Sequence, residues 1–418
     1  MTDNYSDEKN TIPLNIFWLG FLIYIFSYLI AQSDKVSYAL CNVFQIIGLL
    51  MFIPSAVFLI RFKVENRYLG SVYILFLLWS AGVFLRGISF DYDSVKRLLF
   101  RPDSGIFLYL LPLVLLFPRG PVFFKKVFNV VVILGVIYLI LCLIFIKDLL
   151  IAYSDVRSQS VMEYFTQHLS LPSGFLLLTF IYHSAKRKWF AIFIIVISFV
   201  LAVLRARRGL MFITFNIMFF AYLIYQYVNK TKVINIILSI FIIILVSAIA
   251  VKIYNDNRKG TFSLITERMG QQTRSEVEQY FFSDLKSKDW VIGKGINGQY
   301  FCPGVTEGVG RVSIYRRVIE TGYLQVILNG GIISLGLLLL IAIPAIFKGL
   351  FYSKNVLSKT AAIWIFLFLL YMYPGTLTIF SMHYILVWIS IGICFSNELR
   401  NMSDSRILEI LNRKKINL

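Results

Sequence analysis

Long apolar stretches follow one another along nearly the whole chain and are separated by short polar segments. A bilayer core about 30 Å thick is crossed by about 20 helical residues, and a backbone that faces lipid satisfies its own hydrogen bonds as a helix. The pattern therefore predicts an all-α polytopic membrane protein with about twelve transmembrane helices. The predicted spans are 12–31, 37–60, 69–85, 105–118, 127–146, 168–183, 189–204, 209–228, 233–253, 322–347, 360–379 and 381–396.

The polar segments divide this chain into four regions. Residues 1–253 hold the first nine predicted spans, and residues 322–396 hold the last three. Between them, residues 254–321 form the only long polar stretch, and its aromatic residues and glycine turns indicate a folded lid more than a disordered linker. Residues 397–418 form a basic tail.

The composition agrees with that of a membrane protein and argues against a nucleic-acid-binding function. Hydrophobic residues make up 58% of the 418 residues and charged residues 15%, whereas a soluble chain carries roughly 25% charged residues. The net charge of +19 would suggest nucleic acid in a soluble protein, but the basic residues lie mainly between apolar runs. We therefore expect them to contact lipid headgroups and to set topology, and we expect no nucleic-acid partner.

The distribution of basic residues predicts the orientation of the chain. More of them are cytoplasmic if both termini lie inside and the segment 254–321 lies outside, although the bias is modest. The first ten residues lack the basic region of a signal peptide, and no small-residue cleavage site follows the first apolar run. We expect that run to remain as the first span.

Three arginines are predicted on the outer side, contrary to the preference of basic residues for the cytoplasmic side. Arg205, Arg207 and Arg208 sit between two apolar runs at the predicted outer face. A guanidinium group binds phosphate oxygens through paired charge-assisted hydrogen bonds, so the cluster could bind a phosphate or pyrophosphate. The alternative is that the arginines reach lipid headgroups along their aliphatic stems.

A second charged cluster closes the long polar segment. It contains Arg311, Arg316, Arg317 and Glu320, and Tyr323 follows at the start of the tenth span. In a helix, Arg316 and Glu320 would share a face as an ordinary salt bridge. The functional alternative is that the arginines hold phosphates while Glu320 acts as general base on a sugar hydroxyl.

Other motifs carry less information. The glycine-rich stretch 290–298 lacks P-loop spacing and is expected to shape the lid. Asp91 and Asp93 have the spacing of a metal-binding carboxylate pair, but such a pair arises easily by chance, and the three histidines form no ligand motif. We predict no metal and no cofactor. Acidic residues are almost absent from the spans, which argues against an ion-coupled pump.

Three features together resemble bacterial O-antigen polymerases and the related O-antigen ligases. They are the pair Arg208-Gly209 at the head of a span, the sequence IGKGINGQYFCP at 292–303, and the sequence RRVIETGYLQVILNGGIISLG at 316–336. Ligases of this kind commonly carry a His-Asn pair before the Tyr-Leu that opens the helix after the loop. This chain has Glu320-Thr321-Gly322 there instead, which favours a polymerase.

The resemblance implies a glycosyltransferase of surface polysaccharide or lipopolysaccharide biosynthesis in the bacterial cytoplasmic (inner) membrane. Such an enzyme joins undecaprenyl-pyrophosphate-linked repeat units at the outer face of the membrane, without a metal or a nucleotide sugar. The implied partners are carrier-linked glycans, membrane lipids and a chain-length regulator protein. An O-antigen ligase and a flippase of lipid-linked saccharides remain the alternatives.

Overall fold

The computed structural model describes residues 3–33, 35–101, 105–150, 162–230, 273–303 and 314–412, together with 234, 252 and 255–256. Within these ranges the protein is an all-α membrane protein with one short β-hairpin. Its elements are α1 (Asp3–Gln32), α2 (Tyr38–Leu59), α3 (Arg67–Gly87), α4 (Tyr92–Phe100), α5 (Gly105–Leu110), η1 (Leu111–Leu116), α6 (Pro121–Ile144), α7 (Ile146–Leu150), η2 (Thr166–Ser170), α9 (Ser173–Leu178), η3 (Phe180–Tyr182), α10 (Ala185–Leu204), α11 (Arg208–Asn229), α14 (Thr273–Asp284), α15 (Ser287–Ile292), β1 (Tyr300–Phe301), β2 (Tyr315–Arg316), α16 (Gly322–Phe351), α17 (Val356–Tyr371), α18 (Met382–Phe395), α19 (Asn397–Asn401) and α20 (Asp404–Asn412).

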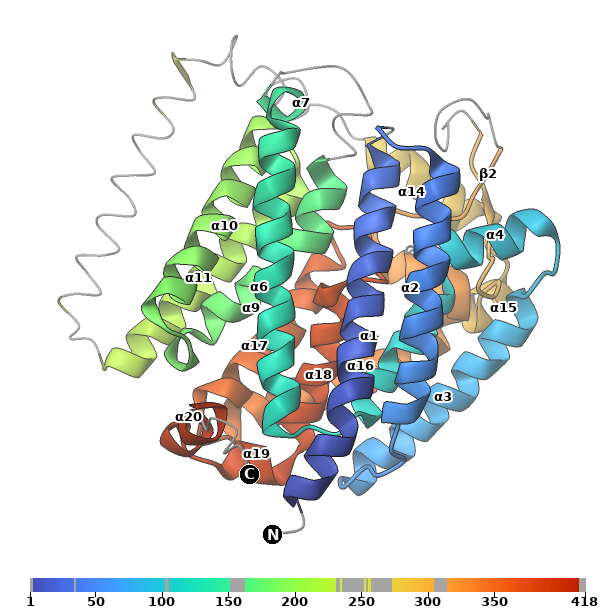
Figure 1. The fold of residues 1–418 in the computed structure, drawn as a ribbon. Coiled ribbons are helices and arrows are strands. Elements are labelled where there is room, and N and C mark those ends of the chain that lie inside the picture. The colour runs from blue at the N-terminus through green and yellow to red at the C-terminus, as the bar shows by residue number, and fades with distance from the viewer. Residues whose placement is uncertain are drawn as a thin grey trace.

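Seven helices in the described part of the chain are long and apolar enough to cross a bilayer. They are α1 from Thr11 onward, α2, α3, α6, α10, α11 and α16, and each covers one predicted span. In Figure 1 most of them run roughly along one direction, with the start of α1 and the helices α19 and α20 at one end of the bundle. The multi-pass fold class is thereby confirmed, while the count of twelve spans stays a prediction.

Glycines let the first two helices approach closely. A Cβ atom on Gly20 would lie 2.7 Å from the Gly48 carbonyl oxygen, and one on Gly48 would lie 2.8 Å from the Gly20 carbonyl oxygen. In a lipid bilayer the hydrophobic effect does not drive helices together, and small residues at facing positions commonly allow close van der Waals packing of their backbones. The contact anchors α1 against α2.

The short helices α17 and α18 form the centre of the bundle. Every residue of α18 is buried, and most of α17 is buried as well. By contrast, Phe58 on α2 and Leu85 on α3 expose most of their side chains, as expected for helices that face lipid. The centre therefore need not span the bilayer with continuous helix, because the outer helices shield it from lipid.

Two of the shorter predicted spans are not regular α-helix along their whole length. The span 105–118 is α5 and η1, and α4 meets this pair at a bend of 53°. The span 168–183 consists of the π-helical turn η2, the short helix α9 and the 3-10 turn η3. Pro172 follows η2, and a proline disturbs the regular hydrogen-bond ladder because it has no N–H to donate.

The boundaries near the C-terminus also differ from the prediction. Helix α17 ends at Tyr371 and not at residue 379, because Pro374 and Gly375 interrupt the apolar run. A new helix begins only after Ser381, whose side chain accepts a hydrogen bond from the Tyr384 backbone N–H. The predicted span 233–253 lies almost wholly outside the described residues.

Helix α16 is broken at Gly331, where φ is 70°. The Leu328 and Asn329 carbonyls near this break accept hydrogen bonds from the backbone N–H groups of Lys294 and Gly295, at 2.7 and 2.8 Å. A broken helix in a membrane needs such replacement partners for its backbone. The glycine-rich stretch therefore supports the kink of α16, in addition to its expected part in the lid.

The described parts of the segment 254–321 pack against one another and against α16. Helices α14 and α15 pack beside the antiparallel strands β1 and β2, in which Tyr300 pairs with Arg316. Phe281, Tyr300, Cys302 and Ile319 are among its buried hydrophobic residues. Figure 1 shows α14 and β2 at the end of the bundle opposite α19 and α20.

Candidate functional site

The segment 372–381 between α17 and α18 contacts residues that adjoin both charged clusters predicted from sequence, namely Gly209 and Gly322. The Pro374 carbonyl accepts a hydrogen bond of 2.5 Å from Arg274 Nη2. The same carbonyl lies against Gly209, since a Cβ atom there would be 2.8 Å from the Pro374 oxygen. The start of α11 and the start of α14 thus lie on the same turn of chain, although they are far apart in sequence.

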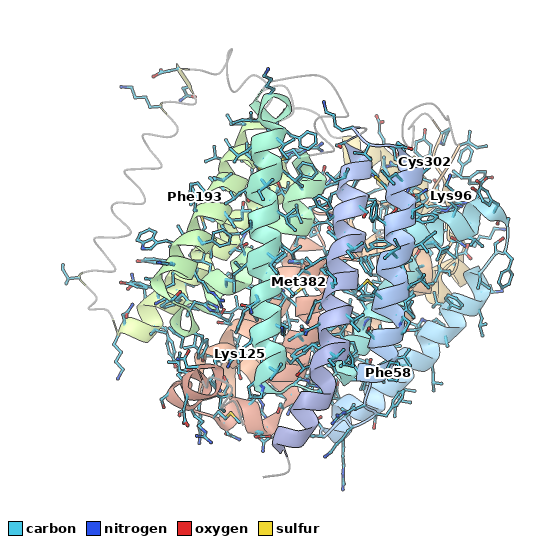
Figure 2. The ribbon with its side chains drawn as sticks, viewed as in Figure 1. Phe58, Lys96, Lys125, Phe193, Cys302 and Met382 are labelled. Atoms are coloured by element: carbon cyan, nitrogen blue, oxygen red, sulfur yellow. The ribbon has the colours of Figure 1, made fainter. Side chains whose placement is uncertain are left out.

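This turn lies within the height of the helix bundle. Helix α17 has 16 residues and α18 has 14, so at 1.5 Å per residue they span about 24 and 21 Å, less than a bilayer core of about 30 Å. Figure 2 shows Met382, the first residue of α18, between the levels of Cys302 at one end and Lys125 near the other. Irregular backbone at such a depth is tolerated where protein buries it or where it lines a cavity.

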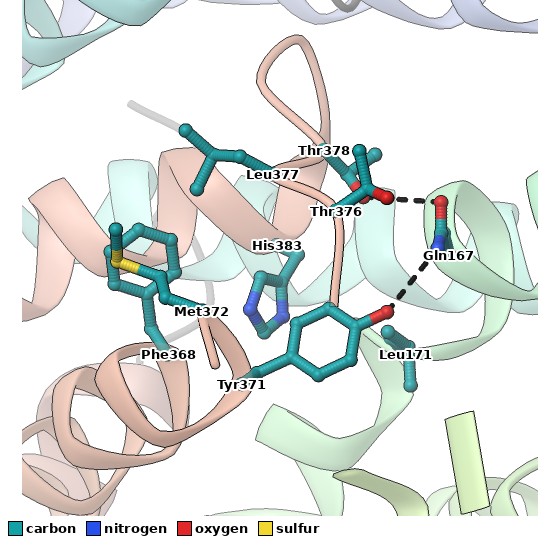
Figure 3. Close-up of a pocket in the computed structure, with 9 residues that line it drawn as sticks. All are labelled: Gln167, Leu171, Phe368, Tyr371, Met372, Thr376, Leu377, Thr378 and His383. Atoms are coloured by element: carbon teal, nitrogen blue, oxygen red, sulfur yellow. Dashed lines mark hydrogen bonds between the residues drawn. The ribbon is translucent and has the colours of Figure 1, made fainter. Parts of the chain in front are cut away.

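Arg207 is held by a polar network that reaches this turn. Its Nη1 atom lies 2.8 Å from Glu163 Oε2. Gln167, one helical turn after Glu163, donates to Glu163 Oε1 and to the Tyr371 hydroxyl, both at 3.2 Å. The Thr378 hydroxyl in turn donates to the side-chain oxygen Oε1 of Gln167 at 3.2 Å (Figure 3). The network therefore links the Arg207 guanidinium group to the end of α17 and to the turn that follows it.

Glu320 is held by Arg274. The Arg274 Nε atom lies 3.1 Å from Glu320 Oε2, and both side chains are partly exposed. Thr321 donates to Glu278 on α14, and the Gly322 N–H donates to the Met372 carbonyl at 2.7 Å. These contacts fasten the residues after the lid onto the turn at 372–375.

The predicted helical pairing of Arg316 with Glu320 is wrong. Tyr315 and Arg316 form strand β2, and residues 317–320 adopt no helix. Helix α16 begins at Gly322, where the tenth span was predicted to begin, so the helix does not reach back to Arg316. The i, i+4 relationship therefore does not exist, and Arg274 is the ion-pair partner of Glu320.

The remaining predicted arginines occupy different environments. Arg205 is 1% exposed, and its Nε donates to the Leu149 carbonyl at 3.0 Å, so this side chain also braces α10 against α7. Arg208 opens α11 and is exposed. With the Gln299 amide oxygen turned toward it, Arg317 donates to Gln299 at 2.5 and 3.0 Å. Arg311 lies outside the described residues.

Tyr323 faces the bundle and not the lid. Its hydroxyl donates to the Leu369 carbonyl at 2.6 Å, which links the first turn of α16 to the last turn of α17. In this structure the Tyr323 hydroxyl is therefore bonded to the backbone of α17. A role in binding substrate, as implied by the resemblance, remains a prediction.

Sequence reasoning missed Arg274, Glu163 and Gln167. Arg274 lies in the polar run QQTRSEVEQY and Glu163 and Gln167 lie before an apolar run, with no motif around them. Their importance comes only from tertiary contacts with Glu320, Arg207 and Tyr371. A local pattern could not have found them.

Asp91 has a structural role in the described fold. It caps α4 by accepting a hydrogen bond from the Ser94 N–H at 2.9 Å and another from the Ser89 hydroxyl. These hydrogen bonds lower the pKa of Asp91 to about 2, because they stabilise the carboxylate form. Asp91 is thus the N-cap of α4, and Asp93 lies in the first turn of the same helix.

No protein-family profile matches this chain, and neither a curated protein nor a solved structure matches it.

Proposed function

We propose that the protein is a polymerase that joins undecaprenyl-pyrophosphate-linked oligosaccharide repeat units into O-antigen or a related surface polysaccharide. The proposal builds on the sequence resemblance described above. One structural observation supports it most. Arg274, which binds Glu320, and Gly209, which follows Arg208, contact the same carbonyl of Pro374.

This arrangement suits a donor that carries a pyrophosphate at a membrane surface. Arg207 and Arg274 are held by Glu163 and Glu320, so their guanidinium groups are fixed in place before a substrate arrives. Arg208 adds an exposed guanidinium at the start of α11. Positive charge that is already oriented stabilises the negative charge that grows on a departing pyrophosphate.

The proposed reaction is a direct displacement at the anomeric carbon of the donor. The oxygen of an acceptor hydroxyl forms a bond to that carbon as the bond to the carrier pyrophosphate breaks, so the configuration inverts. Glu320 takes the proton from the acceptor hydroxyl, and the arginines receive the pyrophosphate. General base catalysis of this kind contributes about 10²–10⁴-fold.

The polysaccharide of a strain that lacks the protein tests the proposal. We expect surface chains of a single repeat unit, and full-length chains should return with the wild-type gene but not with Arg208→Ala. Free carrier-linked polymer would instead identify a ligase. Carrier-linked single units that accumulate in the cytoplasm would identify a flippase, and either result would overturn the proposal.

A further inference from the structure

The short helix α4 carries an apolar ridge on its exposed side. Tyr92, Val95 and Leu99 all have exposed side chains, and their spacing of three and four residues places them on one face of the helix. Ser94 and Leu98 form the opposite, buried face. A row of exposed apolar side chains on a surface helix marks a contact with another molecule or with lipid.

The ridge continues the lipid-facing surface of α3. Leu78 and Leu85 are 66% and 72% exposed on this helix, which is long and apolar enough to span the bilayer. In the connection to α4, Phe90 is 84% exposed, and Tyr92 at the start of α4 is 76% exposed. Aromatic side chains are enriched where a membrane meets water. The continuity with α3 therefore favours lipid as the phase that covers the ridge.

The C-terminal end of α4 is held at a defined depth by two transmembrane helices. The Leu99 carbonyl accepts a hydrogen bond of 2.8 Å from the Tyr24 hydroxyl on α1. The Phe100 carbonyl accepts one of 3.1 Å from Gln45 Nε2 on α2. Tyr24 lies eight residues before the end of α1 and Gln45 seven residues after the start of α2, which at 1.5 Å per residue is about 12 and 10 Å inside the helix ends. A helix that lies in a membrane surface buries its apolar face by about 5–10 Å.

The direction of α4 also suits a surface helix. Figure 1 shows it lying across the direction of α2, and it meets the pair α5–η1 at a bend of 53°. Its nine residues make it about 14 Å long, which is too short to cross a bilayer core of about 30 Å. The ridge can therefore contact a single leaflet along its whole length.

The polar residues around the ridge carry a net positive charge. The stretch 86–101 contains four basic and two acidic residues, and one of the acidic residues, Asp91, is the N-cap of α4. The Lys96 ammonium group lies 5.8 Å from the centre of the Tyr92 ring, beside the ridge. Figure 2 shows Lys96 near the level of Cys302 in the lid. A lysine in this place can reach a phospholipid phosphate while its aliphatic stem covers apolar surface.

Both connections of α4 touch the glycine-rich stretch of the lid. Before α4, the Gly87 carbonyl accepts a hydrogen bond of 2.9 Å from Asn297 Nδ2. After α4, a Cβ atom on Gly105 would lie 2.8 Å from the Ile296 carbonyl oxygen. The same stretch supplies the N–H groups that support the break in α16. A membrane contact of α4 therefore acts on the lid through two short connections.

We propose that α4 is an interfacial helix whose ridge of Tyr92, Val95 and Leu99 lies in the phospholipid leaflet on the side of the lid. Lys96 contacts the phosphates of that leaflet, and α4 anchors the glycine-rich stretch of the lid to the membrane surface. The inference concerns the membrane and not the reaction. It therefore goes beyond the proposed polymerase and does not depend on it.

Spin labels on single cysteines test the position of α4. The purified, full-length protein, with its four native cysteines replaced, is placed at one copy per nanodisc in phosphatidylcholine mixed with phosphatidylglycerol. Labels at Val95 and Leu99 are compared with a bilayer reference at Leu78 and a water reference at Ser287, which are both exposed. Molecular oxygen concentrates in lipid and a polar nickel chelate stays in water, so the two collision rates report the surroundings of each label.

We expect both α4 labels to resemble the label at Leu78, with a preference for oxygen several-fold above that at Ser287. A preference equal to that at Ser287 would place the ridge in water. Labels that neither reagent reaches would place it against protein. Either result would overturn the proposal.

The lipid composition tests the part assigned to Lys96. The oxygen preference at Val95 should fall in pure phosphatidylcholine, and Lys96→Gln should cause the same fall in the mixed lipid, because each change removes one partner of the charge contact. The label at Leu78 should not respond to either change. A preference at Val95 that stays constant in both cases would remove the contact between Lys96 and phosphate.

Hydrogen exchange tests the anchoring of the lid. In nanodiscs, the double substitution Val95→Ser and Leu99→Ser should speed exchange of the Lys294 and Gly295 amides several-fold, because these amides support the break in α16. Phe58→Ser is the matched control, since Phe58 is 79% exposed on α2, and exchange in α18 reports the overall fold. Unchanged exchange at Lys294 and Gly295 in the double variant would overturn the anchor.

Discussion

Glu320 and Arg274 form an ion pair of 3.1 Å across 46 residues of sequence, and this pair joins the end of the lid segment to the first turn of α14. The same guanidinium binds the Pro374 carbonyl at 2.5 Å. Arg274 therefore holds three separate parts of the chain together at the candidate site. Because the pair is partly exposed, it contributes only about 0–1 kcal/mol to stability.

Arg274→Ala should therefore abolish polymer formation while the protein remains folded and abundant. Arg274→Lys should restore little activity, because an ammonium group cannot bind a carboxylate and a carbonyl in the planar geometry of a guanidinium. Immunoblotting of membranes and the length distribution of surface polysaccharide measure the two effects. Arg406→Ala is the control, since Arg406 forms an exposed pair with Glu409 on α20. Full activity of Arg274→Ala would rule out a role at the site.

Glu320→Gln should lower the rate of polymerisation by about 10²–10⁴-fold if the carboxylate is the general base. Binding of the carrier-linked donor should persist, because the arginines remain. Single-turnover rates and donor binding, measured on the same purified variant, separate the two steps. A wild-type rate in this variant would reduce Glu320 to the ion-pair partner of Arg274.

Arg208→Ala should abolish activity without loss of protein, and Arg208→Lys should rescue it poorly, because a point charge cannot form the paired hydrogen bonds of a guanidinium with phosphate. Arg187→Ala is a matched control on a neighbouring helix, since Arg187 is bonded to Asn129. Polysaccharide length in complemented strains is the readout. Full activity of the lysine variant would argue against bidentate recognition.

Gly331→Ala should destabilise the protein strongly. The backbone there has φ 70° and ψ −175°, a region that costs other residues on the order of 1–3 kcal/mol. An added Cβ atom would also lie 2.0 Å from the Val291 carbonyl oxygen. Gly336→Ala on the same helix meets nothing within 4 Å and should be neutral or slightly stabilising. Thermal unfolding in detergent compares the two, and equal melting temperatures would show that the kink is not required.

The orientation of the chain can be tested with single cysteines in a protein whose four native cysteines have been replaced. Cys302 itself is buried and makes a poor probe. Ser287 on α15 and Ser405 on α20 are exposed. A membrane-impermeant maleimide should label Ser287→Cys in intact cells and Ser405→Cys only after permeabilisation. The reverse pattern would place the candidate site in the cytoplasm.

The long apolar stretches predicted most of the long helices because burial in lipid depends on local composition. The same signal failed where the chain breaks inside the bundle. Helix α17 stops at Tyr371, shortly before Pro374 and Gly375, although the predicted span continues to residue 379, and residues 166–182 change helix type twice within one predicted span. Those breaks are stabilised by partners from elsewhere in the chain, such as Gln167 and Gly322, which no local pattern records.

The residues of the candidate site also differ in whether a local sequence pattern could reveal them. Arg207 and Arg208 were found because charge between two apolar runs is conspicuous, and Glu320 was found because it lies directly before the tenth span. Arg274 was missed because it lies in a polar run where charge is ordinary. The pairing of Arg316 with Glu320 was wrong because it assumed a helix that begins only at Gly322.

Reconstitution tests the central claim most directly. The purified protein in liposomes would be given undecaprenyl-pyrophosphate-linked repeat units, with a chelator present and no nucleotide sugar. The account predicts a ladder of carrier-linked chains that differ by one repeat unit, and no ladder with Glu320→Gln within the same time. Repeat units that stay single with the wild-type protein, or a ladder formed equally well by Glu320→Gln, would contradict it.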